Sequence, residues 1–469
     1  MIALTLAEVA AAAGGRLHDA ADPDVTVVGP VVVDSRQAGP GALFVAVKGE
    51  RTDGHEHVAQ AVALGAVAVL AARPVGVPAI VVEDPVVALG RLAGAVLERL
   101  TGVTVTAVTG SSGKTTTKDL LAAVLETDGP TVAAKGSFNT EVGVPLTVLA
   151  ADETTRHLVV EMGARGPGHL AYLCRIAPPQ IAVVLNVGAA HVGEFGGLAA
   201  TAAAKRELVQ ALPPGGVAVL NADDPLVAAM APAAPGRVVW FGLSGSADVR
   251  AEAVRLDERG RATFDLVAAG NRVPAGLALH GAHQVSNALA VAAVALEVGI
   301  PPVAVAAALA IATPRSRWRM EVTERSDGVT VVNDAYNANP DSMRAALEAL
   351  AAMSAGRRSW AVLGEMLELG AASAEEHAAV GRLAVRLGVS RVVAVGDGAR
   401  GVHEAAAAAP PAPPARTVGE EPVFVPDAAA AVALLRDQVR GGDVVLVKAS
   451  RGVGLERVAE ALLEQEART

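Results

Sequence analysis

The sequence predicts an α/β protein of three domains, and three observations lead to this class. Apolar residues make up 52% of the 469 residues but aromatic residues only 2%, so the cores consist of Val, Leu, Ala and Ile. Short β-branched runs alternate with Ala-rich stretches of helical spacing, which is typical of parallel sheets covered by helices. A Gly-rich turn at Thr109–Thr117 follows one such run and has the form of a phosphate-binding loop.

Charge and cysteine content restrict the function classes. The net charge of −10 argues against a general nucleic-acid surface, although a local basic pocket can still bind an anionic small molecule. The single cysteine, Cys174, rules out a disulfide framework. No apolar run reaches the roughly 18 residues of a membrane span, and no basic segment of a signal peptide begins the chain. We therefore expect a soluble cytoplasmic protein with no nucleic-acid partner and no membrane span.

The first domain is predicted over residues 1–98, as a small α/β domain of short Val-rich runs and Ala-rich helices. The central domain is predicted over residues 99–313, as a doubly wound nucleotide-binding sheet that the phosphate-binding loop opens. Pro314 ends a helical pattern, so residues 314–469 are predicted to be a Rossmann-like C-terminal domain. The strands expected in the last two domains include His157–Glu161, Ile181–Asn186, Val217–Asn221, Val329–Asn333, Ser359–Leu363, Val392–Val395 and Val444–Lys448.

The phosphate-binding loop carries the strongest chemical signal. After the strand, its residues are Gly110, Ser111, Ser112, Gly113, Lys114, Thr115 and Thr116. Backbone N–H groups of such a turn and the helix N-terminus attract phosphate, Lys114 can reach a β- or γ-phosphate, and the Thr115 hydroxyl can hold Mg²⁺. Val108 stands where the usual spacing has glycine, so this is a shorter variant. A simple helix-capping turn is the alternative, but it leaves the Lys-Thr-Thr run unexplained.

Three further side chains are candidates for a metal site beside the phosphates. Glu161 ends one strand, and His191 lies five residues after Asn186, which ends the next. A carboxylate and a neutral imidazole at this edge of a sheet suit a divalent metal. Lys205 lies among small residues, where burial can lower its pKa, and a neutral lysine can take up CO₂ to give a metal-binding carbamate. The ordinary alternatives are a loop carboxylate, a hydrogen-bonded histidine and a solvated lysine.

Polar segments also follow strands of the other two domains. In Asn333–Pro340, Asp334 can accept a bond from ribose or metal-bound water and Tyr336 can stack on adenine, unless the segment only caps the next helix. Lys448–Gly452 offers two cations and a hydroxyl, which fit a carboxylate or phosphate. In the first domain, Asp34–Arg36 and Lys48–His55 together indicate a polar pocket with spaced cations.

Taken in order, these motifs resemble the Mur ligase family over nearly the whole chain. Asp334–Pro340, and the lack of an Asp-Asn-Pro-Arg motif, favour the type that adds D-Ala-D-Ala over the type that adds the third amino acid. Thr140 and Ala449 depart from the common Asn and Gly of the family. The segments that carry the resemblance are Asp34–Arg36, Phe44–Gly49, Asp53–His55, Thr109–Thr116, Gly136–Leu149, Glu161–Gly163, Asn186–His191, Ala204–Glu207, Asn333–Met343, Val362–Gly370 and Leu446–Arg451.

The resemblance implies an ATP-dependent amide ligase that joins D-Ala-D-Ala to UDP-MurNAc-tripeptide through an acyl phosphate, in peptidoglycan precursor synthesis. It implies two Mg²⁺ ions, one at Thr115 and Glu161 and one at His191 and a carbamylated Lys205, with Lys114, His191 and Lys205 as catalytic residues. Beyond the loop, the implied nucleotide contacts are Asn287, Arg319, Asp334, Tyr336, Asn337 and Asn339. The implied substrate contacts are Ser35, Arg36, Lys48, Asp53, His55, Asn139, Lys448, Ser450 and Arg451. A monomer is expected.

Two other functions compete with this interpretation. The first is another ligase of the same fold, either the third-residue-adding type or a folylpolyglutamate-synthase-like enzyme. The second is an NTP-driven switch without an acyl acceptor, which would leave the polar pocket of the first domain without a purpose.

Overall fold

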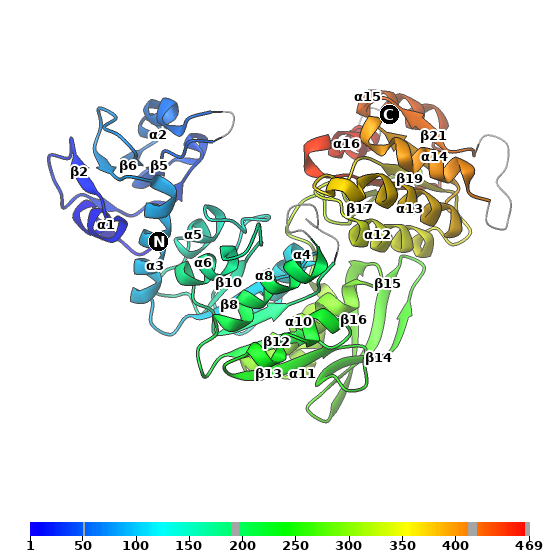
Figure 1. The fold of residues 1–469 in the computed structure, drawn as a ribbon, viewed down its shortest axis with the longest axis horizontal. Coiled ribbons are helices and arrows are strands. Elements are labelled where there is room, and N and C mark those ends of the chain that lie inside the picture. Colours follow the sequence, from blue (N-terminus) through cyan, green and yellow to red (C-terminus); the bar gives the residue numbers. More distant parts are fainter. Residues whose placement is uncertain (50–51, 189–196, 411–419, 465–469) are drawn as a thin grey trace.

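The computed structural model describes residues 1–49, 52–188, 197–410 and 420–464, which form three successive α/β units (Figure 1). The first unit has the sheet order β2-β7-β6-β5-β4, in which only β2 runs antiparallel to its neighbour. A small pair, β1 (Leu4–Thr5) and β3 (Thr26–Val27), lies beside it. The other elements are α1 (Leu6–Ala13), β2 (Arg16–His18), β4 (Val31–Val32), β5 (Ala42–Val45), α2 (Val58–Ala63), β6 (Ala66–Ala71), β7 (Ala79–Val81) and α3 (Pro85–Arg99).

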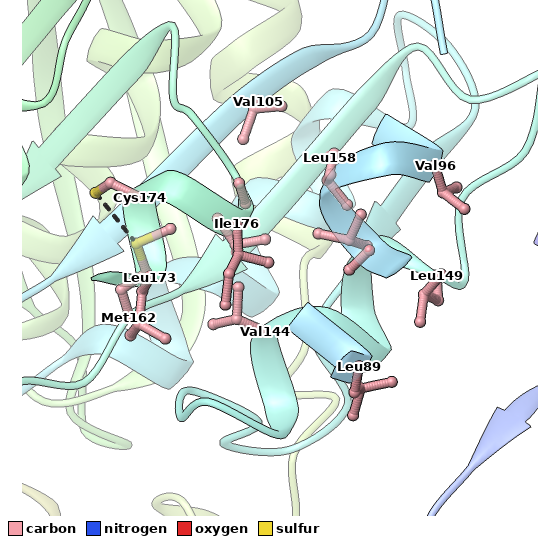
Figure 2. Close-up of a cluster of buried hydrophobic side chains, with 14 of the residues drawn as sticks. Leu89, Val96, Val105, Val144, Leu149, Leu158, Met162, Leu173, Cys174 and Ile176 are labelled. Carbon is pink, nitrogen blue, oxygen red and sulfur yellow. Dashed lines mark hydrogen bonds between the residues drawn. The ribbon is translucent and has the colours of Figure 1, made fainter. Parts of the chain in front are cut away.

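Helix α3 joins the first unit to the second. Asp84 caps it by accepting the Val86 and Val87 N–H groups, and proline fills its first position. Leu89 and Val96 of α3 belong to one continuous buried cluster with α5 (Gly143–Val148) and α6 (His169–Ile176) (Figure 2). The same cluster includes side chains of α1, so the two units share an apolar core through α3.

The central sheet has the order β16-β15-β14-β13-β12-β11-β8-β10-β9. Its strands from β9 to β14 are parallel, and β15 and β16 are antiparallel. The chain proceeds from β8 to one side of the sheet and then to the other, which makes the carboxyl end of β8 a binding position. The elements are β8 (Thr104–Thr109), α4 (Lys114–Leu125), β9 (Thr131–Ala133), β10 (His157–Glu161), β11 (Ile181–Val184), α8 (Leu198–Gln210), β12 (Val217–Asn221), α9 (Pro225–Ala228), β13 (Arg237–Gly242), β14 (Val249–Leu256), β15 (Arg261–Ala268), β16 (Asn271–His280), α10 (Gln284–Glu297) and α11 (Pro302–Ile311).

The third sheet has the order β17-β18-β22-β19-β20-β21, parallel except for β17. Buried clusters cover both of its faces, as expected for a Rossmann-like sheet. Its elements are β17 (Glu321–Glu324), β18 (Thr330–Asn333), α12 (Pro340–Met353), β19 (Ser359–Leu363), α13 (Ser373–Arg386), β20 (Arg391–Val395), α14 (Arg400–Ala408), β21 (Val423–Val425), α15 (Ala428–Gln438), β22 (Val444–Lys448) and α16 (Glu456–Glu464).

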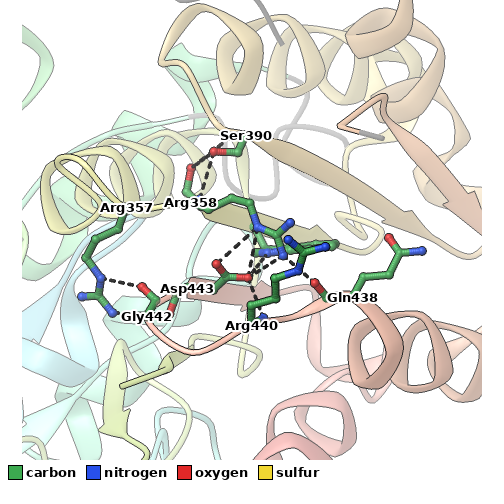
Figure 3. A network of polar contacts seen from close by, with 9 residues as sticks. Arg357, Arg358, Ser390, Gln438, Arg440, Gly442 and Asp443 are labelled. Atoms are coloured by element: carbon green, nitrogen blue, oxygen red, sulfur yellow. Dashed lines mark hydrogen bonds and ion pairs between the residues drawn. The ribbon is translucent and has the colours of Figure 1, made fainter. Parts of the chain in front are cut away.

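A buried carboxylate fastens the amino-terminal ends of this third sheet (Figure 3). Asp443 precedes β22 and accepts hydrogen bonds from the Arg358 side chain (2.7 Å), the Trp360 indole N–H (2.9 Å) and the Arg440 backbone N–H (3.0 Å). Because the same buried group accepts a hydrogen bond from each donor, this network makes the amino-terminal end of the sheet rigid.

The predicted fold class is confirmed, with two differences in detail. The strand expected to end at Asn186 ends at Val184, and the antiparallel ribbon β14–β16 was not predicted. The domain boundaries at 98/99 and 313/314 remain predictions. Helix α3 spans the first of them and packs against helices of both the first and the central unit. None of the described helices combines the length and apolarity needed to cross a bilayer.

Candidate active site

A cleft of about 640 Å³ lies between the phosphate-binding loop and the third sheet. Its described lining residues all fall between Gly110 and Arg451. The structure thus brings together most of the predicted site. The predicted residues that line the cleft are Gly110, Ser111, Ser112, Gly113, Lys114, Thr115, Thr116, Asn139, Glu161, Lys205, Asn287, Arg319, Asp334, Tyr336, Asn337, Asn339, Lys448 and Arg451.

The phosphate-binding loop follows the buried strand β8 and opens α4. Gly113 has φ +81°, and a Cβ there would lie 2.5 Å from the Asn287 Oδ1, so both backbone and space require glycine. The first N–H groups of α4 have no partner within the helix and are available to an anion. The Lys114 ammonium donates to the Gly110 carbonyl at 2.7 Å. Burial lowers the pKa of Lys114, while the Glu161 carboxylate acts in the opposite direction.

Asn186 fastens this loop to the end of β11, a contact that the sequence analysis missed. Its Oδ1 accepts the N–H groups of Ser111 (3.0 Å) and Ser112 (2.9 Å). Since these two amides are already paired, the unpaired amides of this loop are those at the start of α4. The signal that could have found this role is the amide side chain at the end of a neighbouring parallel strand.

Glu161 is 1% exposed and has one unsatisfied oxygen. Its Oε1 accepts from the Asn139 side-chain amide at 2.7 Å, whereas its buried Oε2 has no hydrogen-bond partner among the described residues. Such an orphaned buried carboxylate oxygen calls for a partner, and a cation beside the Thr115 hydroxyl would supply one. Asn139 therefore positions Glu161 in this structure, in addition to lining the cleft. His191 lies outside the described residues.

The Thr115 hydroxyl is hydrogen-bonded to an arginine of the third domain. The Arg319 guanidinium donates to the Thr115 hydroxyl at 3.2 Å and to the Ser137 hydroxyl at 2.9 Å. The same guanidinium lies 4.1 Å from the centroid of the Tyr336 ring. The Tyr336 ring is therefore covered by Arg319 on one face, and its stacking on adenine stays a prediction. Ser137 was not predicted, although it lies two residues before Asn139.

Lys205 is buried on α8, with 4% of its surface exposed, so the solvated alternative is wrong. Burial lowers its pKa to about 7, and the positive charge of Lys114 contributes in the same direction. A large fraction of this side chain is thus neutral near pH 7, which is the form that reacts with CO₂.

On the third-domain side, Asp334 and Lys448 neutralise each other. The Lys448 ammonium lies 2.6 Å from the Asp334 Oδ2 and also donates to the Asn337 carbonyl at 2.8 Å. Burial lowers the pKa of Lys448, and Asp334 opposes this shift. Asn339 caps α12 and also donates weakly, at 3.4 Å, to the Ser111 carbonyl of the phosphate-binding loop. The capping alternative is therefore correct for Asn339, and the residue also contacts the loop.

Two cleft residues at the start of α10 were not predicted. His283 precedes the helix and lies four residues before Asn287, which places both on one face. Burial lowers the pKa of His283 to about 4, so its ring is neutral at physiological pH. Gln284 accepts the Asn287 side-chain amide at 2.9 Å and fixes its orientation. The i, i+4 spacing from Asn287 is the signal that could have found His283.

The segment that leads into the third domain is fastened to α4. The Asp119 carboxylate accepts the backbone N–H groups of Arg315 (3.2 Å) and Ser316 (2.9 Å). Lys118 forms a buried ion pair with Asp119, and Arg315 forms a bidentate pair with Glu126 at the other end of the helix. One helix thus carries Lys114 of the predicted phosphate site and the anchor of the connecting segment.

The predicted residues of the first domain do not reach the cleft, since the first and third domains lie at opposite ends of the central one (Figure 1). The Ser35 hydroxyl donates to Gln60 at 2.7 Å, and Arg36 pairs with Asp34 at the surface. Ser35 is buried, whereas Arg36 and Lys48 are exposed, and all three lie in the segments that follow β4 and β5.

Asp53 and His55 are engaged within their own loop. Hydrogen bonds from the backbone and ring of His55 lower the pKa of Asp53 to about 2, and His55 Nε2 accepts the Ala72 N–H at 3.0 Å. Ser450, also predicted as a substrate contact, lies behind the cleft and accepts the Leu367 N–H at 3.0 Å.

Comparison with known proteins identifies the family. Three family profiles match in order: "Mur ligase family, catalytic domain" at residues 28–97, "Mur ligase middle domain" at 108–295 and "Mur ligase, glutamate ligase domain" at 318–451. The chain is 51% identical to the UDP-N-acetylmuramoyl-tripeptide–D-alanyl-D-alanine ligase of Mycobacterium tuberculosis over 503 residues, covering 99% of each. It is 36% identical to the Escherichia coli protein of that name over 471 residues, again covering 99% of each.

Solved structures agree with this assignment. The structure of MurF from Acinetobacter baumannii superimposes with a TM-score of 0.86 at 32% identity, covering 98% of this chain and 99% of that one. MurF from Thermotoga maritima in complex with ADP gives a TM-score of 0.79 at 31% identity, covering 94% of this chain and 99% of that one. The chain belongs to the Mur ligase family of ATP-dependent ligases.

Proposed function

We propose that this chain joins D-alanyl-D-alanine to UDP-N-acetylmuramoyl-tripeptide with cleavage of ATP to ADP and phosphate. The observation that carries the proposal is the 51% identity, over 99% of both chains, to a ligase named for those two substrates. The cleft between the phosphate-binding loop and the cations of the third domain supports the same reaction, because it can hold a triphosphate and an acid together.

The chemistry follows from the charges in the cleft. A carboxylate is a poor electrophile towards an amine, so one of its oxygens first attacks the γ-phosphorus and ADP leaves. The dipeptide amine then attacks the acyl phosphate, loses a proton, and phosphate leaves. Both the acid and the γ-phosphate are anionic, and Lys114 and Arg319 are the cations that would offset their repulsion.

Two metal positions belong to this proposal. The orphaned Oε2 of Glu161 and the Thr115 hydroxyl fit a hard divalent cation, and His191 with a carbamylated Lys205 would hold the second. No three carboxylate, imidazole or thiol groups gather among the described residues, so phosphate oxygens and water would complete each shell. Bound Mg²⁺ would neutralise charge that develops on the phosphate oxygens.

The remaining predicted residues form three groups, proposed to bind the uridine end of the nucleotide substrate, the ATP, and the peptide. Ser35, Arg36 and Lys48 are proposed for the uridine end, on the first domain, with Asp53 and His55 shaping their loop. Asn287, Asp334, Tyr336, Asn337 and Asn339 are proposed for ATP, and Asn139, Lys448, Ser450 and Arg451 for the peptide side. Because these first-domain residues lie apart from the cleft, the substrate would have to span the distance between them. The monomeric state stays a prediction.

The test is ADP release by the purified protein given ATP, Mg²⁺ and the nucleotide tripeptide, with and without D-Ala-D-Ala. We expect ADP release that depends on the dipeptide. The product should be heavier than the nucleotide tripeptide by the mass of D-Ala-D-Ala less one water. Release that requires a free diamino acid or glutamate instead would assign the chain to another ligase type. Release without any acyl acceptor would indicate a nucleotide-driven switch.

A further inference from the structure

Five side chains at the edge of the cleft alternate between arginine and aromatic rings. The Trp318 ring has the guanidinium of Arg451 at 4.1 Å from its centroid and that of Arg317 at 5.1 Å. The Tyr336 ring has Arg319 at 4.1 Å and Arg451 at 6.0 Å. In a chain with only 2% aromatic residues, this concentration of rings beside cations marks a built feature.

Each of the two arginines near the Trp318 ring also forms an ion pair with a carboxylate. Arg451 pairs with Glu456 at 3.0 Å and Arg317 with Glu460 at 3.2 Å. Both carboxylates belong to α16 and lie four residues apart, on one face of that helix. Two guanidinium groups thus lie near the ring, and each of them pairs with a carboxylate of the same helix.

The backbone at this point is unfavourable for a large residue. Trp318 has φ +59° and Met320 has φ +49°, both in the left-handed region where bulky side chains are rare. The indole N–H of Trp318 is also buried without a hydrogen-bond partner among the described residues. Glycine would remove the backbone strain at this position, and a smaller apolar residue would leave no N–H unpaired. We therefore attribute the tryptophan to the contacts of its ring with the two guanidinium groups.

We propose that Trp318 is a positioning residue for the acceptor side of the cleft. Its ring holds the Arg451 guanidinium where it can pair with the carboxylate of the incoming dipeptide. Arg451 lines the cleft and Trp318 does not, so the ring acts through the arginine. This inference rests on the proposed function, because the dipeptide is the acceptor named there.

The structure favours a carboxylate over a phosphate as the partner of Arg451. Arg319 is the arginine that contacts the phosphate side, through the hydroxyls of Thr115 and Ser137. The contacts of Arg451 are instead with Glu456, Trp318 and Tyr336, all within the third domain. The Arg451 guanidinium carries five N–H donors, and its Nη1 pairs with Glu456, so the remaining N–H groups of the fork can pair with the carboxylate of a substrate.

The experiment compares Trp318→Leu, Trp318→Phe and Trp360→Phe with the wild-type protein in steady-state ligation. Trp360 is the matched control, because it also lies between two arginines, Arg358 and Arg391, but at the opposite end of the third sheet. Loss of a partly desolvated cation–π contact corresponds to a KM for D-Ala-D-Ala raised about tenfold in Trp318→Leu. We expect the KM for ATP to stay within twofold, Trp318→Phe to recover most of the affinity, and Trp360→Phe to lower thermal stability without moving either KM.

Each outcome supports or overturns a distinct statement. If the wild-type protein forms no product with D-Ala-D-Ala, the proposed function is wrong. If the wild type ligates the dipeptide and Trp318→Leu keeps the wild-type KM for it, or raises the KM for ATP equally, this inference is wrong. Should Trp318→Leu not fold, Arg451→Lys decides: it should raise the KM for D-Ala-D-Ala about tenfold and leave the KM for ATP within twofold, and an unchanged KM for the dipeptide would overturn the proposal.

Discussion

The proposed carbamate on Lys205 makes catalysis depend on CO₂. Only a neutral amine reacts with CO₂, and the pKa of about 7 leaves half of Lys205 neutral at pH 7. At the ordinary lysine value of 10.5 only about 1 side chain in 3,000 would be neutral, since each unit changes the ratio tenfold. Burial therefore raises the reactive population by about three orders of magnitude.

The assay is ADP release in CO₂-depleted buffer with ATP, nucleotide tripeptide and dipeptide. We expect activity to fall to about a tenth or less and to return when bicarbonate is added, because a Lys205 without the carbamate offers no anionic group to Mg²⁺ and is a cation in its protonated half. Protonation competes with carbamylation, so lowering the pH from 8 to 6 should increase the bicarbonate concentration needed. Carbon-13 bicarbonate should give a carbamate resonance that is lost in Lys205→Met and kept in Lys135→Met, which alters an exposed lysine.

Two results would refute this reasoning. Activity that is indifferent to bicarbonate, in a protein with no carbamate resonance, would leave Lys205 as a buried amine without that modification. A resonance that persists in Lys205→Met would assign the carbamate to another amine.

Three further predictions concern the phosphates, the metal and the fold. Lys114→Ala should lower dipeptide-dependent ADP release at least about 100-fold, the loss typical of removing one preorganised charge-stabilising group; near-normal ligation would contradict the phosphate-binding loop. Glu161→Gln should raise the Mg²⁺ concentration for half-maximal rate about tenfold or more, and an unchanged Mg²⁺ titration would exclude it as a ligand. Asp443→Ala leaves the Trp360 N–H without its acceptor and should destabilise the third domain by about 3–5 kcal/mol in guanidinium unfolding. Asp397→Ala, whose carboxylate is 88% exposed, is its control, and an equal shift would show that burial of Asp443 is unimportant.

The strands that could be predicted are those buried on both faces. His157–Glu161 and Val444–Lys448 read as continuous apolar runs because helices cover each side of their sheets. The ribbon β14–β16 was not predicted because its charged residues are at the surface, where Glu252 of β14 pairs with Arg250 of the same strand and with Arg272 of β16. Its pattern resembles a polar loop until the partner strands are known.

The same distinction applies to the site. The phosphate-binding loop could be predicted because its residues are contiguous, and the chemistry depends on local backbone. The pairs Asp334–Lys448 and Asn186–Ser111 could not, because their members are 114 and 75 residues apart and only the strand order brings them together. The separation of the first domain from the cleft could not be predicted from the sequence either, because composition does not determine the angle between domains.

Helix α4 has a mechanical consequence, because the connecting segment is anchored to it at Arg315 and Ser316. Any swing of the third domain turns about a pivot next to the phosphate loop. Arg319, three residues beyond this pivot, travels little, whereas the distant edge of the sheet at β21 travels most. Such a rotation would therefore alter the peptide side of the cleft more than the phosphate-binding loop.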